Sequence, residues 1–310
     1  MLGKSHAFRY RDATVIITLP TRDQATESHD EGSRAYLDGY VLEYGADIAR
    51  TAGINTVDVV VQQGEAIDVP IEIFARQPKA VDLLSAPQQQ RLDDIVTAST
   101  DIASNAFEYW LSLLRWKTNN FRIGRREPLD NQSGWSTYLH DTETHHPIWA
   151  ATIFLNVNFS SAITENVWEE VRSTAERAEE TPIFYKLLDD AHESHNRREF
   201  RRSIIDAAIA CEVFMRSLVM NKVPLELDAD MRQMLEEANI NQYLRKFVPN
   251  LLAEKRRTVF KALVNDHLNS LFDVRNKIMH MAREDRATAE NCIRFIKATQ
   301  TLFEIGKTYE

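Results

Sequence analysis

The chain has 310 residues, of which 44% are hydrophobic and 27% are charged, and it contains nine glycines and nine prolines. This composition excludes collagen-like and broadly disordered chains, and the length exceeds the usual size of one hydrophobic core, so we expect two folded domains. The net charge of −9 is unevenly distributed: residues 1–180 hold 16 basic and 27 acidic residues, whereas residues 181–310 hold 21 and 19. The acidic stretch 176–182 is the expected domain boundary.

The first domain, residues 1–180, is predicted to be a mixed α+β region. Its first eleven residues are basic but have no apolar segment behind them, which argues against a secretory signal. Short segments rich in Val and Ile, separated by Gly, Asn and Asp, are typical of strands. They cover residues 13–19, 56–62 and 66–74, and a weakly helical segment covers residues 38–50.

A long amphipathic helix is expected over residues 90–118, where the apolar residues fall on one helical stripe. Residues 119–147 are polar and contain several Gly and Pro, so we predict a loop there, followed by a strand at 149–159 and a helix at 165–178. The longest apolar run, residues 148–157, is about half of the roughly 20 residues that a membrane-spanning helix needs, so no membrane contact is expected.

The second domain, residues 181–310, is predicted to be an antiparallel bundle of helices. Its four main apolar stripes cover residues 183–196, 197–220, 252–280 and 288–305, and one or two short helices at 231–247 are expected to end at Pro249. Cys211 and Cys292 are the only cysteines. Because both lie within these stripes, we interpret them as reduced core thiols, which is typical of a cytoplasmic protein.

One polar element at the end of the helix predicted at 252–280 could carry chemistry. Arg275 and His280 are separated by four residues, which places them about 140° apart around a helix, whereas Asn276 and His280 are only about 40° apart. Asn276 could therefore orient His280. Asp273 lies on the same polar face and could steady either the imidazole or a neighbouring cation.

Arg275 lies at the edge of the apolar stripe, where a guanidinium needs a carboxylate or a phosphate as its partner. Glu212, on the helix predicted at 197–220, is one candidate carboxylate. A purely structural interpretation explains the same residues, with Arg275 in a buried ion pair and His280 interacting favourably with the end of its helix. An arginine followed by a histidine after four to six residues also occurs at Arg22 and His29, in a polar segment.

Two segments together resemble the HEPN superfamily: EFRRSIIDAAIACEVF at residues 199–214 and LFDVRNKIMH at residues 271–280. The resemblance covers residues 182–308. It implies a bundle of four or five helices that forms a homodimer, in which both copies of the Arg-x4–6-His motif face one cleft. It also implies a metal-independent ribonuclease without a cofactor, of the kind that acts as a toxin or in defence against phage.

If the resemblance holds, His280 would transfer a proton to or from the ribose 2′-hydroxyl or the leaving 5′-oxygen. Arg275 would neutralise charge on the phosphoryl oxygens. The implied partners are RNA, a second copy of the chain, and a protein regulator or antitoxin, with residues 1–180 as a sensor or regulatory domain. The competing hypothesis is a catalytically inactive HEPN module that binds RNA, a nucleotide or a protein.

Three other groups of side chains have a functional interpretation beside a structural one. Histidines with neighbouring acidic residues could hold a metal ion, or they could be solvated surface residues. Tryptophans with neighbouring cations could stack on nucleic-acid bases, or they could form the core and flank of a helix. Clusters of basic residues could contact phosphates, or they could be solvated helix faces. The two histidine groups are His140, His145 and His146 with Asp141 and Glu143, and His192 and His195 with Glu193. The tryptophan group is Trp110 and Trp116 with Arg115 and Lys117. The three basic clusters are Arg197, Arg198, Arg201 and Arg202; Arg245 and Lys246; and Lys255, Arg256 and Arg257.

Overall fold

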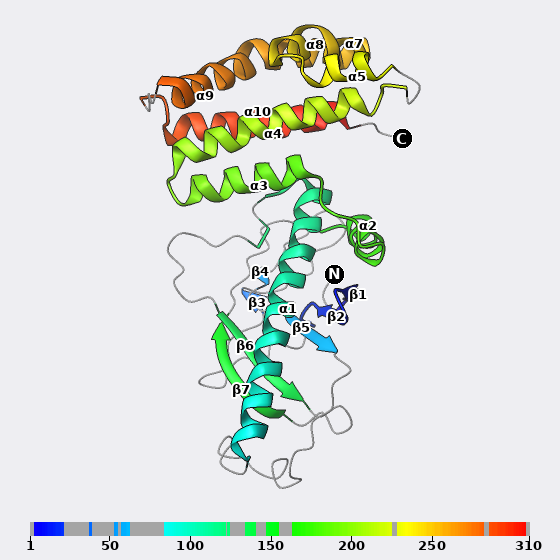
Figure 1. Ribbon diagram of the computed structural model, residues 1–310, viewed down its shortest axis with the longest axis vertical. Helices are drawn as coiled ribbons and strands as arrows, with labels where there is room; N and C mark the ends of the chain where they lie inside the picture. The colour runs from blue at the N-terminus through cyan, green and yellow to red at the C-terminus, as the bar shows by residue number, and fades with distance from the viewer. Residues whose placement is uncertain are drawn as a thin grey trace, which may run out of the picture. The chain divides into compact units, whose positions relative to one another are not determined.

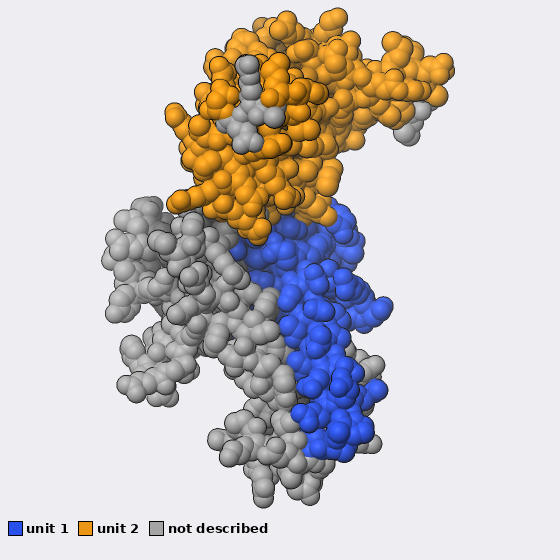
Figure 2. All heavy atoms as spheres, turned by 60° about the vertical axis from the view of Figure 1, so that its left-hand side comes forward, with its two compact units in different colours: residues 1–180 blue, residues 181–310 orange. Residues whose placement is uncertain are grey.

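A computed structural model of the chain shows an α+β protein that divides into two compact units, Met1–Glu180 and Thr181–Glu310 (Figures 1 and 2). The structure describes residues 3–21, 37–38, 53–54, 57–62, 84–121, 123–124, 134–140, 147–154, 163–224, 228–281 and 285–307. The predicted strand at 66–74, nearly all of the predicted helix at 38–50, and the Arg22 to His29 spacing lie outside these ranges.

The first unit contains a three-stranded antiparallel sheet in the order β1 (Ser5–Tyr10), β2 (Ala13–Thr18), β5 (Asp58–Gln62). In β2 every second side chain is buried, as expected for a strand with one face on a core. The sequence predicted β2 and β5, but β1 was missed. The reason is that β1 contains no Val or Ile, and one of its two buried side chains, His6 beside Phe8, is polar.

Two helices, α1 (Ala86–Thr118) and α2 (Glu165–Glu176), pack with this sheet into one hydrophobic core. The long helix α1 begins with a capping box between Ser85 and Gln88, which satisfies backbone N–H groups of its first turn. It ends at Asn119, whose φ of 51° is left-handed, a conformation that asparagine tolerates at helix ends. The predicted helices at 90–118 and 165–178 are thus confirmed.

Two further antiparallel pairs of strands belong to the first unit: β3 (Leu37–Asp38) with β4 (Gly53–Ile54), and β6 (Gly134–His140) with β7 (Pro147–Phe154). The strand predicted at 149–159 corresponds to β7. The loop predicted over 119–147 is wrong for its last part, because β6 lies there. The Ser, Thr and His residues of β6 made the segment look polar, although its Trp, Thr and Tyr residues favour extended backbone.

The second unit is a helical bundle. Its main helices are α3 (Ile183–Asn196), α4 (Phe200–Met220), α10 (Ala289–Gly306), and a continuous helical segment made of α8 (Glu254–Leu263), a π-helical turn η5 (Val264–Leu268) and α9 (Asn269–Met281). Figure 1 shows α3 on one side, α4 and α10 in the middle, and α7 to α9 on the other side. The four predicted stripes correspond to these helices, within a few residues at each end.

Short helices connect α4 with α8: α5 (Ala229–Glu236), α6 (Ile240–Gln242), the π-helical turn η4 (Tyr243–Phe247) and α7 (Val248–Leu251). Pro249 does not end this series, as the sequence had suggested; it lies in the first turn of α7. The backbone is helical without a break from η4 into α7, so Pro249 leaves one position of the helix without an N–H donor but does not interrupt it. The segment ends instead at Leu252, whose ψ of 139° is extended.

The core of the second unit combines an aromatic cluster with a few buried polar pairs. Phe184, Phe214 and Phe303 meet with ring centroids 4.7 to 5.2 Å apart. The Sγ atom of Cys211 lies 3.1 Å from Oγ1 of Thr299, and neither cysteine is in a disulfide. The interpretation of the cysteines as core thiols is confirmed. Among the helices that the structure describes, none is long and apolar enough to cross a bilayer.

Candidate functional site

The Arg-x4-His element lies in the last two turns of α9, the helix that packs against α4. Leu271, Val274 and Ile278 are buried and fix which side of α9 faces the bundle. Arg275 is half-buried at the edge of this apolar stripe, as its position in the sequence predicted, and His280 is exposed.

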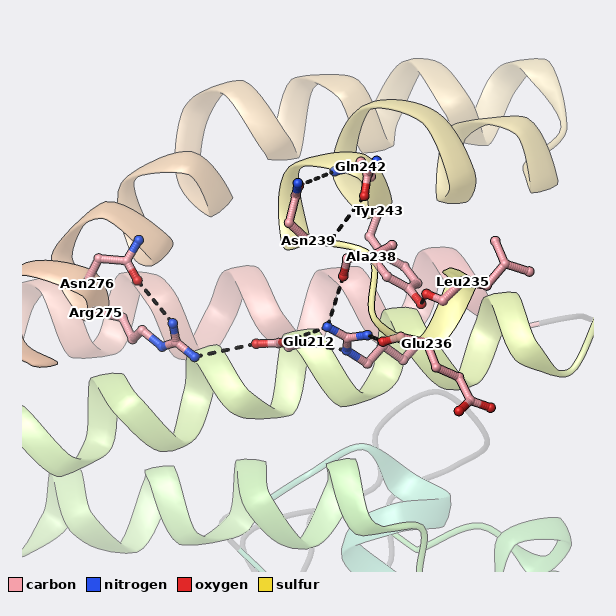
Figure 3. A network of polar contacts seen from close by, with 10 residues as sticks. Glu212, Leu235, Glu236, Ala238, Asn239, Gln242, Tyr243, Arg275 and Asn276 are labelled. Atoms are coloured by element: carbon pink, nitrogen blue, oxygen red, sulfur yellow. Dashed lines mark hydrogen bonds and ion pairs between the residues drawn. The ribbon is translucent and has the colours of Figure 1, made fainter. Parts of the chain in front are cut away.

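Arg275 is held by one carboxylate and one amide (Figure 3). Its Nη2 atom lies 3.5 Å from Oε2 of Glu212 on α4, with the side chains of Arg275 and Glu212 exposed by 30% and 24%. Its Nη1 atom donates a hydrogen bond of 3.0 Å to Oδ1 of Asn276. The expected pair between Arg275 and Glu212 is therefore present, but at the surface of the bundle rather than in a sealed core.

Glu212 is shared with a second arginine, Arg216, which follows it by one turn of α4. The Nη2 and Nε atoms of Arg216 lie 2.9 and 3.3 Å from Oε1 of Glu212. Arg216 was not predicted as part of the site. Its only signal in the sequence is the Glu-to-Arg spacing of four residues, which is common on helices and by itself indicates a modest surface pair.

Asp273 interacts with cations rather than with an imidazole. Its Oδ2 atom lies 2.7 Å from Nζ of Lys277 and 3.6 Å from Nη1 of Arg286. Of the two roles predicted for Asp273, the one of steadying a neighbouring cation is the one that the structure shows.

His280 projects from the last turn of α9 into solvent, and none of the described residues forms a hydrogen bond with it. Asn276 does not orient it, although the spacing of four residues had suggested this. The amide oxygen of Asn276 faces Arg275 instead, because a charged guanidinium is a strong hydrogen-bond donor. Among the described residues, the imidazole of His280 therefore has no partner.

Arg275 and His280 leave α9 in different directions. Five residues of α-helix separate them by about 7.5 Å along the axis and by about 140° around it. Within one chain they are therefore two neighbouring groups, of which only Arg275 has a side-chain partner among the described residues, and they do not form a single cluster.

Of the two interpretations of the tryptophans on α1, the structure supports the helix core for Trp110. Trp110 is fully buried, and its Nε1 atom donates a hydrogen bond of 2.8 Å to Nδ1 of His6. Arg115 is buried as well, with Nε donating to the carbonyl of Ile123 at 2.8 Å. The ring of Trp116 is covered by Nζ of Lys117 at 4.0 Å. These residues belong to the core and flank of the helix, so base stacking is excluded for Trp110.

For the two histidine groups, the structure describes only one set of side chains. His145, His146 and their acidic neighbours lie outside the described residues. His192 and His195 lie on α3, and the ring of His195 packs 5.9 Å from that of Phe200. Within the described part of the chain, no three His, Cys, Asp or Glu side chains are grouped so that they could hold a metal ion.

The basic clusters differ in what they contact. Arg257 donates to the carbonyls of Pro249 and Leu252, at 2.8 and 3.0 Å, and Arg256 donates to the carbonyl of Lys307 at 2.8 Å, so both are structural. At the start of α4, by contrast, arginines line an open pocket of about 550 Å³. The pocket's basic residues are Arg198, Arg201 and Arg202, and Ala287, from the turn that follows α9, also lines it.

Comparison of the chain with models of known protein families, with curated proteins and with solved structures finds no match.

Proposed function

We propose that this protein is a metal-independent endoribonuclease of the HEPN type, with Arg275 and His280 in its active site. The proposal is supported by one observation above others: the bundle presents a partly exposed guanidinium and an exposed imidazole, the latter without a partner among the described residues, on neighbouring turns of one helix. Arg275 contacts Glu212 through one nitrogen at 3.5 Å and Asn276 through another at 3.0 Å, so three of its five N–H donors have no partner among the described residues and can meet a phosphate.

The chemistry follows from these two groups. The ribose 2′-oxygen attacks the adjacent phosphorus, its proton passes to a base, and the bond from phosphorus to the 5′-oxygen of the next nucleotide breaks as that oxygen takes up a proton. An imidazole exchanges protons near neutral pH and suits this role. Arg275 stabilises the charge on the phosphoryl oxygens, and the products are a 2′,3′-cyclic phosphate and a 5′-hydroxyl.

A second copy of the chain is part of this proposal. Because Arg275 and His280 leave α9 on different sides, two copies related by a two-fold axis can bring the arginine of one and the histidine of the other to the same phosphate. The HEPN resemblance implies such a homodimer through the helical bundle.

The experiment is to incubate the purified protein with labelled RNA in EDTA and to compare it with the Arg275→Ala and His280→Ala variants. We expect cleavage to fall by about 100-fold or more in each variant, as is typical when a catalytic proton donor or charge stabiliser is removed. Arg294→Ala is a matched control, because Arg294 lies on α10 and contacts Ser270 and the ring of Phe295. Cleavage that is unchanged in both site variants would refute the assignment.

A DNA oligonucleotide of the same sequence provides an independent test. DNA lacks the 2′-hydroxyl that acts as the nucleophile, so it should remain intact at enzyme concentrations that cut RNA completely. Cleavage of both would indicate a hydrolytic nuclease instead.

A second candidate function is a binding module that holds RNA, a nucleotide or a protein without cutting anything. The observation that favours it is the engagement of Asn276 with Arg275, which leaves His280 without an orienting partner among the described residues. Tight RNA binding by the wild-type chain, with no product after prolonged incubation, would support this function.

The proposed biological role is that of a toxin or anti-phage defence effector acting in the cytoplasm, with residues 1–180 as its sensor and a protein regulator or antitoxin as its partner. The role predicts that expression of the wild-type chain arrests growth and that His280→Ala relieves the arrest. Equal growth with both chains would contradict it.

A further inference from the structure

The carboxylate of Glu212 lies between two guanidinium groups that hold it unequally. Arg216 contacts Oε1 through two nitrogens, at 2.9 and 3.3 Å, whereas Arg275 reaches Oε2 through one nitrogen at 3.5 Å. A carboxylate and a guanidinium joined by two short hydrogen bonds attract each other more strongly than the same groups joined by one long contact. Arg275 is therefore the partner that leaves Glu212 more easily.

Arg216 is fixed from several directions. Besides Glu212, it donates hydrogen bonds to the carbonyl of Ala238, at 3.1 Å, and to the carbonyl of Glu236. Its guanidinium carbon lies 5.0 Å from the centre of the Tyr243 ring, a favourable cation–π geometry. Arg216 thus has partners that do not depend on where Arg275 points.

The segment that holds Arg216 is itself tied together locally (Figure 3). The hydroxyl of the buried Tyr243 donates to the carbonyl of Leu235 at 2.5 Å. Asn239 and Gln242 exchange hydrogen bonds of 3.1 Å in a capping box that starts α6. These local hydrogen bonds hold the connection from α5 to η4 in the conformation in which its carbonyls accept hydrogen bonds from Arg216.

From this arrangement we propose that Arg216 is a positioning residue for Arg275. It keeps Glu212 paired when Arg275 turns from the carboxylate to a phosphate of the bound RNA. Without Arg216, the same movement would leave a half-buried carboxylate alone beside an incoming anion, which is costly. The inference rests on the proposed function, and it extends the site to the segment from Leu235 to Tyr243.

The test is a pair of double-mutant cycles measured on RNA binding. The probe is an oligoribonucleotide with 2′-O-methyl groups, which cannot be cleaved by attack of the 2′-oxygen, so binding is measured apart from the reaction. We expect Arg216→Met to weaken binding by about 3- to 10-fold in the wild-type chain, the size of coupling found between residues of one polar network. In the Arg275→Met chain the same substitution should have less than about 2-fold effect.

The second cycle uses Glu212→Gln, which keeps the shape of the side chain but removes its charge. In the Glu212→Gln chain, the movement of Arg275 leaves no unpaired negative charge behind. Arg216→Met should therefore again change the affinity for RNA by less than about 2-fold. Circular dichroism and the urea midpoint of each variant verify folding. If Arg216→Met unfolds the bundle, Glu212→Gln decides by itself: it should tighten RNA binding, and only where Arg275 is present.

The outcomes separate this inference from the proposed function. An equal effect of Arg216→Met in all three backgrounds would overturn the inference, even if RNA is cut in an Arg275-dependent way. Coupling of the expected size in a chain that cuts no RNA would support the inference and refute the nuclease. RNA binding that does not depend on Arg275 would refute the inference, whereas the nuclease is refuted only by cleavage that does not depend on Arg275 and His280.

Discussion

His6 shows how a titratable residue can serve the fold rather than a reaction. Its ring is fully buried, accepts a hydrogen bond from Nε1 of Trp110 at 2.8 Å, and lies 3.8 Å from the Trp168 ring, centre to centre. Burial, together with the charges of Arg172 and Lys4, lowers the pKa of His6 from 6.5 to about 4. The imidazole is therefore neutral in the folded protein at neutral pH.

This lowered pKa predicts a loss of stability in acid. Between pH 6.5 and about 4 the unfolded chain binds a proton at His6 that the folded chain does not, so the free energy of unfolding falls as the pH falls, by on the order of 3 kcal/mol over this window. Above pH 6.5 His6 contributes no pH dependence. Urea unfolding at pH 7 and pH 4.5 measures the effect, followed by tryptophan fluorescence, because all five tryptophans lie in residues 1–180.

The control for this prediction is His6→Asn, since an amide oxygen can take the place of Nδ1 as the acceptor for Trp110 but does not titrate in this range. Its stability should change less between the two pH values than that of the wild-type chain. The same pH dependence in both proteins would show that other groups cause it.

The pair between Arg275 and Glu212 could be predicted from the sequence, because a partly buried charge needs a partner of opposite charge. A guanidinium at the edge of an apolar stripe needs a carboxylate, and Glu212 does pair with Arg275. Arg216 and His6 were not foreseen, because their roles depend on partners distant in sequence, such as the carbonyl of Ala238 and the ring of Trp168. Periodicity within one helix or strand carries no information about such contacts.

Among the elements, the helices followed the sequence more closely than the strands did. Apolar residues with a period of 3.6 over twenty positions leave a strong signal, as in α4 and α10. The strands β2 and β5 were predicted although they have only six and five residues, because they are rich in Val and Ile. The strands β1 and β6 contain neither residue, so their composition did not indicate a strand. The π-helical turn η5 was also not predicted, since one extra residue in a turn barely alters the stripe.

The end of α10 offers a test of packing at a single element. A Cβ atom on Gly306 would lie 2.4 Å from Cζ and 2.8 Å from Cε1 of Phe214, a ring held in the aromatic cluster of the bundle. Gly306→Ala should therefore destabilise the second unit by about 1–3 kcal/mol, despite alanine's better helix propensity. Urea unfolding followed by circular dichroism measures the change.

Thr301→Ala, at an exposed position on the same helix, is the comparison for this substitution and should change stability by less than about 0.5 kcal/mol. A stabilised Gly306→Ala variant would mean that the Phe214 ring moves aside at no cost.

At the scale of the whole molecule, the chain forms two separate cores. The core of the first unit is built around Trp110, Trp168 and the sheet, and that of the second around the Phe184, Phe214 and Phe303 cluster. All tryptophans belong to the first unit, and both cysteines belong to the second. Fluorescence and thiol reactivity therefore report on the two units independently.

Residues 181–310 should fold when they are produced without the rest of the chain, since the buried side chains of the bundle contact one another within this range. Burial raises the pKa of Cys211 to about 12 and that of Cys292 to about 11, so both thiols remain protonated and shielded in the folded bundle. A thiol reagent should modify them at a rate limited by opening of the bundle, and at the same rate as in the full chain. If the thiols of the isolated fragment 181–310 react as fast as they do in urea, and its helical circular dichroism is weak, the bundle depends on residues 1–180 for its stability.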